Sequence, residues 1–277
     1  MRATAENAEL ALLLEVSSTP KPGNVDRERE YPDLRFEHFL AGAVGARKGL
    51  AMAADGAPVG EAFESAVAGM SQQSGGNTQF GALLIVTPLV RAAAADELSP
   101  GGARSVVEGT TVDDAASFYE AFEHVDVAVS DPPERMEPLD VRRGADAVPA
   151  VRERGLTLDA LMAESADGDG VAAEWDRGFP RAFDAAEAIA RGDGPVTDRA
   201  AGVFLELLAE EPDTFIADKR DWETAREVSR RAAAVRDGEE DVTAFAAELV
   251  ERGINPGTTA DIVAGALFVA LERGLEV

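Results

Sequence analysis

Apolar residues recur at helical spacing along almost the whole chain, and this periodicity constrains the fold more than any other feature. The runs are rich in alanine, the strongest helix former, and the alternation typical of strands is nearly absent. Only residues 125–130 form a short strand candidate. The sequence therefore predicts an all-α protein of roughly ten helices. We expect helices at residues 8–16, 34–54, 59–70, 77–95, 112–124, 158–165, 172–191, 198–210, 222–236, 242–251 and 259–273.

The length of 277 residues allows one large domain or two small ones. Glycine- and proline-rich breaks occur at residues 98–102, 131–138 and 192–195, but none is long enough to be a convincing linker. No internal repeat is visible. We therefore expect a single globular multi-helix domain spanning residues 1–277.

Acidic residues outnumber basic ones by 52 to 26, which gives a formal charge of −26. The excess acid is spread along the chain, which argues against a nucleic-acid binder and against an anionic membrane surface. A solvated acidic shell of the halophilic type explains it better. We expect small-molecule partners, no nucleic acid and no membrane; a homodimer is a further possibility.

Cysteine is absent, which excludes disulfides, a thiolate nucleophile and a zinc–thiolate site. The N-terminus lacks the charged and apolar regions of a signal peptide. The longest apolar segment, residues 80–90, is too short to span a bilayer. The sequence indicates a soluble, cytoplasmic protein.

Residues 19–26, which read Thr-Pro-Lys-Pro-Gly-Asn-Val-Asp, predict a stiff loop between helices. Two prolines fix φ around Lys21, and Gly23 permits a turn that other residues resist. The loop would present one ammonium to phosphate and, at Asp26, one carboxylate. Because Mg²⁺ prefers one or two carboxylates plus phosphate oxygens, Asp26 is a candidate metal ligand. The alternative is an N-cap or a salt bridge to a neighbouring arginine.

Residues 75–81, which read Gly-Gly-Asn-Thr-Gln-Phe-Gly, precede a strongly apolar helix. Glycines before a helix start let backbone N–H groups approach an anion, and the helix dipole favours negative charge there. Capping by Asn77 or Thr78 is the simpler explanation, although it does not account for the glycines and Gln79. We predict a phosphate-binding segment formed by Gly75, Gly76, Asn77, Thr78 and Gln79.

Two further segments carry charged candidates near the C-terminal end of the chain. Lys219 and Arg220 lie side by side in a mixed-charge loop, where a surface turn or a phosphate grip would explain them. Asp261 follows a glycine-containing loop and begins an apolar helix, where it could simply stabilise the helix dipole.

Three of these segments resemble the triphosphoribosyl-dephospho-coenzyme A synthase family. They are residues 19–26, residues 75–81 and residues 256–261, the last reading Pro-Gly-Thr-Thr-Ala-Asp. Their order and spacing match the family over most of the chain, and residues 140–144 and 213–218 are also similar to family segments. The sequence has the features of a divergent, haloarchaeal-type member.

The resemblance implies a pentosyl transfer. A ribose hydroxyl of dephospho-coenzyme A attacks the anomeric carbon of ATP, adenine leaves, and the triphosphate stays on the transferred sugar. It implies catalytic or metal-binding roles for Asp26 and Asp261, with Mg²⁺ as cofactor and ATP as substrate. Lys21, Gly23, residues 75–79, Lys219 and Arg220 are the candidates for substrate and phosphate.

The sequence departs from the family pattern in three places. Asn24 replaces a usual leucine, Gln79-Phe80 replaces a usual His-Lys pair, and residues 27–33 replace a His- and Asp-bearing stretch. The changes at 79–80 and 27–33 remove a proton donor and a phosphate cation. Two alternatives therefore stay open: a different nucleotide-dependent ribosyl transfer in cofactor biosynthesis, and a non-catalytic nucleotide-binding helical protein.

Overall fold

The computed structural model describes residues 2–129 and 134–277, and within them it is all-helical, as the periodicity predicts. These residues form fifteen α-helices and three short 3₁₀ helices, η1–η3, and no strand. The described part of the strand candidate, residues 125–129, is irregular, and Ser130 lies outside the described residues. The α-helices are α1 (Thr4–Ser17), α2 (Phe36–Ala54), α3 (Val59–Met70), α4 (Phe80–Ala94), α5 (Pro100–Glu108), α6 (Val112–Glu120), α7 (Val148–Arg154), α8 (Leu158–Ser165), α9 (Gly170–Arg177), α10 (Pro180–Arg191), α11 (Val196–Glu210), α12 (Thr214–Lys219), α13 (Trp222–Arg236), α14 (Val242–Glu251) and α15 (Gly257–Glu272). The 3₁₀ helices are η1 (Ala121–Glu123), η2 (Glu134–Leu139) and η3 (Val141–Ala147).

The prediction of roughly ten helices is wrong because several helices are short or interrupted. The run expected at residues 172–191 is two helices, separated where Gly178 and Phe179 adopt positive φ of 77° and 62°. A break expected at residues 98–102 instead begins α5, where the Ser99 hydroxyl accepts the N–H of Gly102 and Pro100 occupies the first turn. Proline and glycine start or interrupt helices here as often as they form loops.

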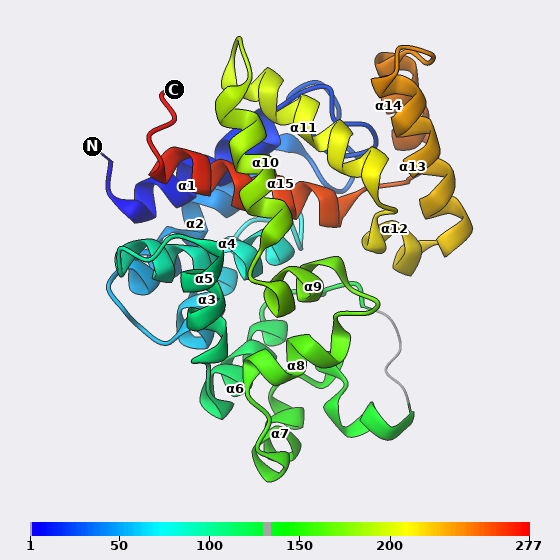
Figure 1. Ribbon diagram of the computed structural model, residues 1–277. Coiled ribbons are helices and arrows are strands. Elements are labelled where there is room, and N and C mark those ends of the chain that lie inside the picture. Colours follow the sequence, from blue (N-terminus) through cyan, green and yellow to red (C-terminus); the bar gives the residue numbers. More distant parts are fainter. Residues whose placement is uncertain (1, 130–133) are drawn as a thin grey trace.

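Helix α15 is the centre of the fold. Nearly all its residues from Thr258 to Leu271 are buried, as expected for a helix that is apolar all round. It packs against α1, α4, α10 and α11 (Figure 1). A side chain at Gly265 would overlap Ile85 of α4, so this glycine lets the two helices approach closely. The N-terminus of α15 is thereby fixed beside that of α4.

Small residues bring α2 and α3 into close contact. A side chain at Gly45 would overlap the backbone of Gly69, and one at Gly49 would overlap Ala62 and Ala66. The glycines are therefore needed for this helix crossing. None of the described helices is both long and apolar enough to cross a bilayer.

Candidate active site

Both carboxylate oxygens of Asp26 accept hydrogen bonds from its own loop. Oδ2 accepts from the Thr19 hydroxyl at 2.8 Å, the Lys21 N–H at 3.1 Å and the Arg29 guanidinium at 3.3 Å. Oδ1 accepts from the N–H groups of Glu28 and Arg29, each at 2.8 Å. The side chain is almost completely buried. Asp26 therefore organises the 19–26 loop.

Lys21 is also buried and forms an ion pair with Glu15 of α1. Its ammonium donates to Asn24 Oδ1 at 2.7 Å and lies 5.9 Å from the centre of the Phe204 ring. Burial raises the pKa of Glu15, and the neighbouring ammonium partly offsets that rise. The charge of Lys21 stabilises the core side of the loop, so its position does not favour the predicted phosphate contact.

The 19–26 loop docks onto residues that precede α15. Gly23 has a φ of 75°, and a side chain there would overlap the carbonyl of Ile254. The Tyr31 hydroxyl lies 2.5 Å from the Gly23 carbonyl and 3.2 Å from that of Ile254. Asn24 donates to Asn255 Oδ1 at 2.8 Å. The 19–26 loop thus supports residues 254–256, which lead into the segment 256–261.

Asp261, in the first turns of α15, lies against the start of α4. A side chain at Gly81 would overlap Asp261 Oδ2, so only glycine permits the carboxylate to come this close. The N–H of Ala82 donates a hydrogen bond to the same carboxylate. The second and third sequence motifs therefore meet at Asp261.

Three further acids lie close enough to act electrostatically on Asp261. Burial, and then repulsion by Glu15, Asp213 and Asp169, raises the pKa of Asp261 well above its usual range. Among the described side chains, no lysine or arginine forms an ion pair with Asp261, Asp213 or Asp169. Strongly perturbed carboxyl groups with a specific set of charged neighbours are typical of functional sites.

Two of these acids serve the local structure as well. Asp213 caps α12 through Ile216 N–H at 3.1 Å, and it accepts from the N–H and hydroxyl of Thr259 at 2.8 and 2.7 Å. Asp169 caps α9, and both hydrogen bonds of that cap fall on Oδ1. Desolvation raises the pKa of each carboxyl, although Asp213 is buried and Asp169 is exposed to solvent.

The position of Asp169 beside α15 could not be read from the sequence. The Gly170 N–H donates to Thr214 Oγ1 at 3.0 Å, and that hydroxyl lies 2.9 Å from Thr258 Oγ1. These bonds hold the start of α9 beside the start of α15. In the sequence Asp169 is an ordinary N-cap residue, with no signal of any other role.

Residues 75–79 precede α4, whose first turn contacts Asp261. A side chain at Gly75 would overlap His38, and Gly76 has a φ of 72°. Asn77 Oδ1 accepts the N–H of Phe80, the first residue of α4, at 3.0 Å, but the N-cap residue is Gln79 and neither Asn77 nor Thr78, so that part of the prediction is wrong. The N–H groups of Phe80 and Ala82 are thus directed to Asn77 and Asp261, two groups of the protein itself.

Gln79 and Phe80, which replace the family's usual His-Lys pair, are buried. Gln79 donates to the Leu12 carbonyl at 3.4 Å, while its Oε1 and the Thr78 hydroxyl are buried without a hydrogen-bond partner. The Phe80 ring packs at 5.0 Å from Phe63 and 4.9 Å from Phe122, between ring centres. These two residues therefore belong to the buried interior and carry no charge.

Lys219 and Arg220 lie at the end of α12, near the start of α15. Arg220 donates to the carbonyls of Arg252 at 2.9 Å and Gly253 at 3.3 Å, where it caps the C-terminal end of α14. Lys219 is exposed, and its ammonium lies 5.7 Å from the centre of the Phe215 ring.

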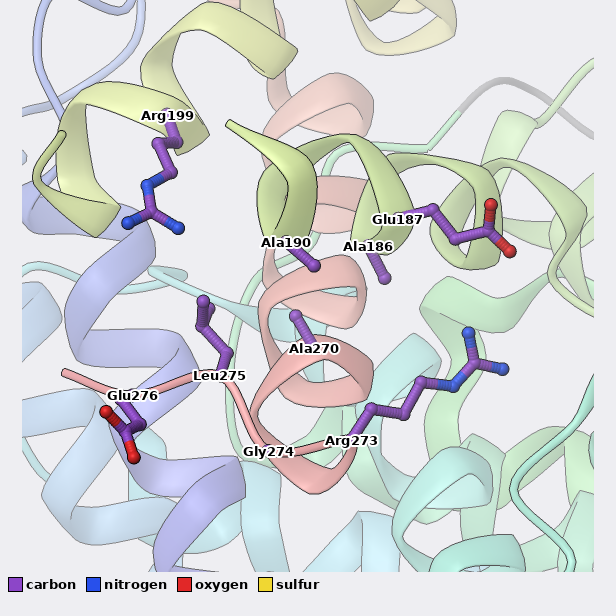
Figure 2. Close-up of a pocket in the computed structure, with 9 residues that line it drawn as sticks. All are labelled: Ala186, Glu187, Ala190, Arg199, Ala270, Arg273, Gly274, Leu275 and Glu276. Carbon is purple, nitrogen blue, oxygen red and sulfur yellow. The ribbon is translucent and has the colours of Figure 1, made fainter. Parts of the chain in front are cut away.

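Two hollows of the described surface lie elsewhere. One, of about 350 Å³, lies between α10 and the C-terminal end of α15 (Figure 2). Its two arginines, Arg199 and Arg273, point away from each other on either side of Leu275, so they do not converge on one ligand. The other lies between α2 and α3. No residue of the three motifs lines either hollow.

Comparison with known proteins identifies the family. The model of the CitG family, ATP:dephospho-CoA triphosphoribosyl transferase, matches residues 1–276. A crystal structure of a provisionally assigned triphosphoribosyl-dephospho-coA synthase from Archaeoglobus fulgidus is 26% identical, with a TM-score of 0.71 over 87% of this chain and 100% of that chain. No curated protein sequence matches the chain. The chain therefore belongs to the CitG family and is a transferase that moves a triphosphoribosyl group to dephospho-CoA.

Proposed function

We propose that the transfer takes place at Asp261, with ATP as donor and a ribose hydroxyl of dephospho-CoA as acceptor. A new C–O bond forms at the anomeric carbon of the ATP ribose while the C–N bond to adenine breaks. The hydroxyl proton is accounted for by the departing adenine, which leaves as the neutral base. The triphosphate remains on the transferred sugar.

The meeting of two motifs at Asp261, with the third supporting the turn before it, carries this proposal. The 19–26 loop supports the turn before α15, and Gly81 at the start of α4 contacts Asp261 directly. Pentosyl transfer passes through an oxocarbenium-like state, which a nearby carboxylate stabilises. A carboxylate with a raised pKa can also accept the proton of the attacking hydroxyl.

The residues around Asp261 fit a magnesium ion better than those around Asp26. Both oxygens of Asp26 are already engaged by five donors of the loop. Asp261 and Asp169 lie near each other without a paired cation among the described side chains. The described residues hold no group of three or more acidic or histidine side chains arranged for a metal. Two carboxylates completed by phosphate oxygens are the usual magnesium arrangement.

We therefore place Mg²⁺ at Asp261 and Asp169. When bound, the ion would neutralise part of the triphosphate charge and hold it in one pose. Lys219 and Arg220 are our candidates for the outer phosphates, since Arg220 contacts Arg252 and Gly253 and Lys219 lies over Phe215, whose ring is beside Gly257. Lys21 and Asp26 keep a positioning role, because they fix the loop that supports the start of α15.

The test is a product analysis with protein, Mg·ATP and dephospho-CoA. We expect free adenine in a one-to-one ratio with the triphosphoribosylated product, and neither ADP nor pyrophosphate. The matched control is Asp159→Asn, which removes a partly buried acid that pairs with Arg104 far from the motifs. Loss of adenine release in Asp261→Asn but not in Asp159→Asn supports the assignment. Release of ADP or pyrophosphate would contradict pentosyl transfer.

A different acceptor or donor is the second candidate, and residues 79–80 favour it. In the family pattern His-Lys at this place would supply a proton donor and a cation, whereas Gln79 and Phe80 here are buried and carry no charge. Adenine release with ATP and a different ribose-bearing acceptor, at a higher rate than with dephospho-CoA, would establish this alternative.

A further inference from the structure

Phe215 is the one phenylalanine that the hydrophobic core does not use. The chain has 12 phenylalanines, and eleven of them belong to a core cluster or pack against one. Phe215 belongs to neither cluster and is only partly buried. The ring is therefore partly accessible to a ligand and is not needed by either core cluster.

The ring is held firmly at the start of α15. The Phe215 N–H lies 3.3 Å from Thr258 Oγ1, and the missing side chain of Gly257 leaves room for the ring to lie against the helix start. A Cβ at Gly257 would be only 3.0 Å from the ring. Thr258 precedes Asp261 by three residues, which is nearly one helical turn. The ring is therefore close to the proposed reaction centre but not part of it.

A cation lies over this ring. The Lys219 ammonium is 5.7 Å from the ring centre, and Lys219 forms no ion pair with any described acid. Of the three lysines in the chain, Lys21 is buried in an ion pair with Glu15 and Lys48 is on α2, which leaves Lys219 as the lysine at this site. In a chain with a charge of −26, an approaching polyphosphate is repelled by most of the surface. A local cation therefore matters more here than it would on a neutral protein.

We propose that Phe215 and Lys219 form a subsite for an adenosine 5′-polyphosphate, with the base stacked on the ring and a phosphate paired with the ammonium. Aromatic rings bind bases through stacking, and lysine acts as a compact charge for phosphate. Both ATP and dephospho-CoA have this chemistry. The subsite rests on the proposed function, because that function supplies both ligands.

Calorimetric titrations with ATP, dephospho-CoA and inorganic tripolyphosphate separate the two contacts. Phe215→Leu should weaken the binding of one of the nucleotides by roughly tenfold and leave the binding of tripolyphosphate unchanged. Phe215→Tyr keeps an aromatic ring and should keep the nucleotide affinity. Lys219→Gln should weaken the binding of the same nucleotide by roughly fivefold. Lys48→Gln, the matched exposed lysine, should change nothing. The nucleotide that is affected identifies the substrate that occupies the subsite.

Circular dichroism melts check that each variant is folded, and Phe215→Leu should melt close to wild type because the ring lies outside the core. Wild-type affinity of folded Phe215→Leu for both nucleotides would overturn the subsite. If Phe215→Leu loses the same affinity for tripolyphosphate as for the nucleotide, the stacking role is overturned. If the wild-type protein binds neither nucleotide, the proposed function itself fails, which is a different result from a failure of the subsite alone.

Discussion

Asp26 and Asp261 are both aspartates that follow a glycine- and proline-containing loop, yet the fold treats them in opposite ways. Five donors within one loop satisfy Asp26, and its burial is complete. Asp261 has acids as neighbours and no paired cation among the described side chains. A carboxylate surrounded by donors stabilises a structure, whereas one surrounded by other carboxylates costs stability and is retained for another reason.

The same contrast holds for the two lysines near the site. Lys21 is buried and neutralises Glu15, while Lys219 is exposed and unpaired among the described residues. In the proposed function, the 19–26 loop supports the start of α15, whereas α12 and α15 provide the groups that bind the substrates.

The largest expected effect is on activity in Asp261→Asn. Adenine release should fall by roughly 10²–10⁴-fold, as for other losses of a catalytic carboxylate. The metal-free protein should melt at the same temperature as wild type or higher, because the substitution removes a charge that burial and Glu15, Asp169 and Asp213 disfavour. Adenine assays and melts in EDTA measure both. A large loss of stability would show that Asp261 has a structural role, as Asp26 has.

Lys21→Met should produce the largest loss of stability. It leaves Glu15 buried beside Asp26 without its cation, and breaking a buried pair from one side costs about 3–5 kcal/mol. Adding Glu15→Gln should restore most of the unfolding free energy. Urea denaturation of the single and double variants makes the comparison. If Lys21→Met instead keeps its stability and loses only phosphate affinity, the lysine binds substrate.

Asp26→Asn should lower the unfolding free energy somewhat less than Lys21→Met does, by about 3 kcal/mol. An amide would direct its NH₂ group at donors that in the wild type point to a carboxylate. The expected signature is a lower melting temperature whether or not Mg²⁺ is present. Activity per folded molecule should change less than in Asp261→Asn. A normal melting temperature combined with lost magnesium dependence would place the metal at Asp26 after all.

The smallest effect concerns salt. With a charge of −26 the chain repels itself, and the Debye length falls from about 10 Å at 0.1 M to about 3 Å at 1 M salt. The melting temperature should therefore rise between dilute buffer and molar KCl. Because the acids around Asp261 repel one another, Asp261→Asn should show a smaller rise than wild type. A melting temperature independent of salt would refute the acidic-shell interpretation.

The sequence predicts the helical class, and several helices to within a residue, because helical periodicity and capping are local signals. Val59–Met70 and Trp222–Arg236 are examples. It also supplies the three motifs and Asp261. It does not predict that Lys21 is buried, since a proline-rich loop looks exposed until its partner on α1 is known. Asp169 and Phe215 are missed because only Thr214 and Thr258, far from each other in sequence, bring them to α15.

Magnesium-dependent ATP binding by folded Asp261→Asn tests whether the metal and the reaction are located at Asp261. Isothermal titrations are made with ATP in Mg²⁺ and, separately, in EDTA. The wild-type protein should bind ATP more tightly with Mg²⁺, and Asp261→Asn should bind it with the same affinity in both buffers. An unchanged magnesium enhancement in the Asn variant would contradict the placement of the metal and of the reaction at Asp261.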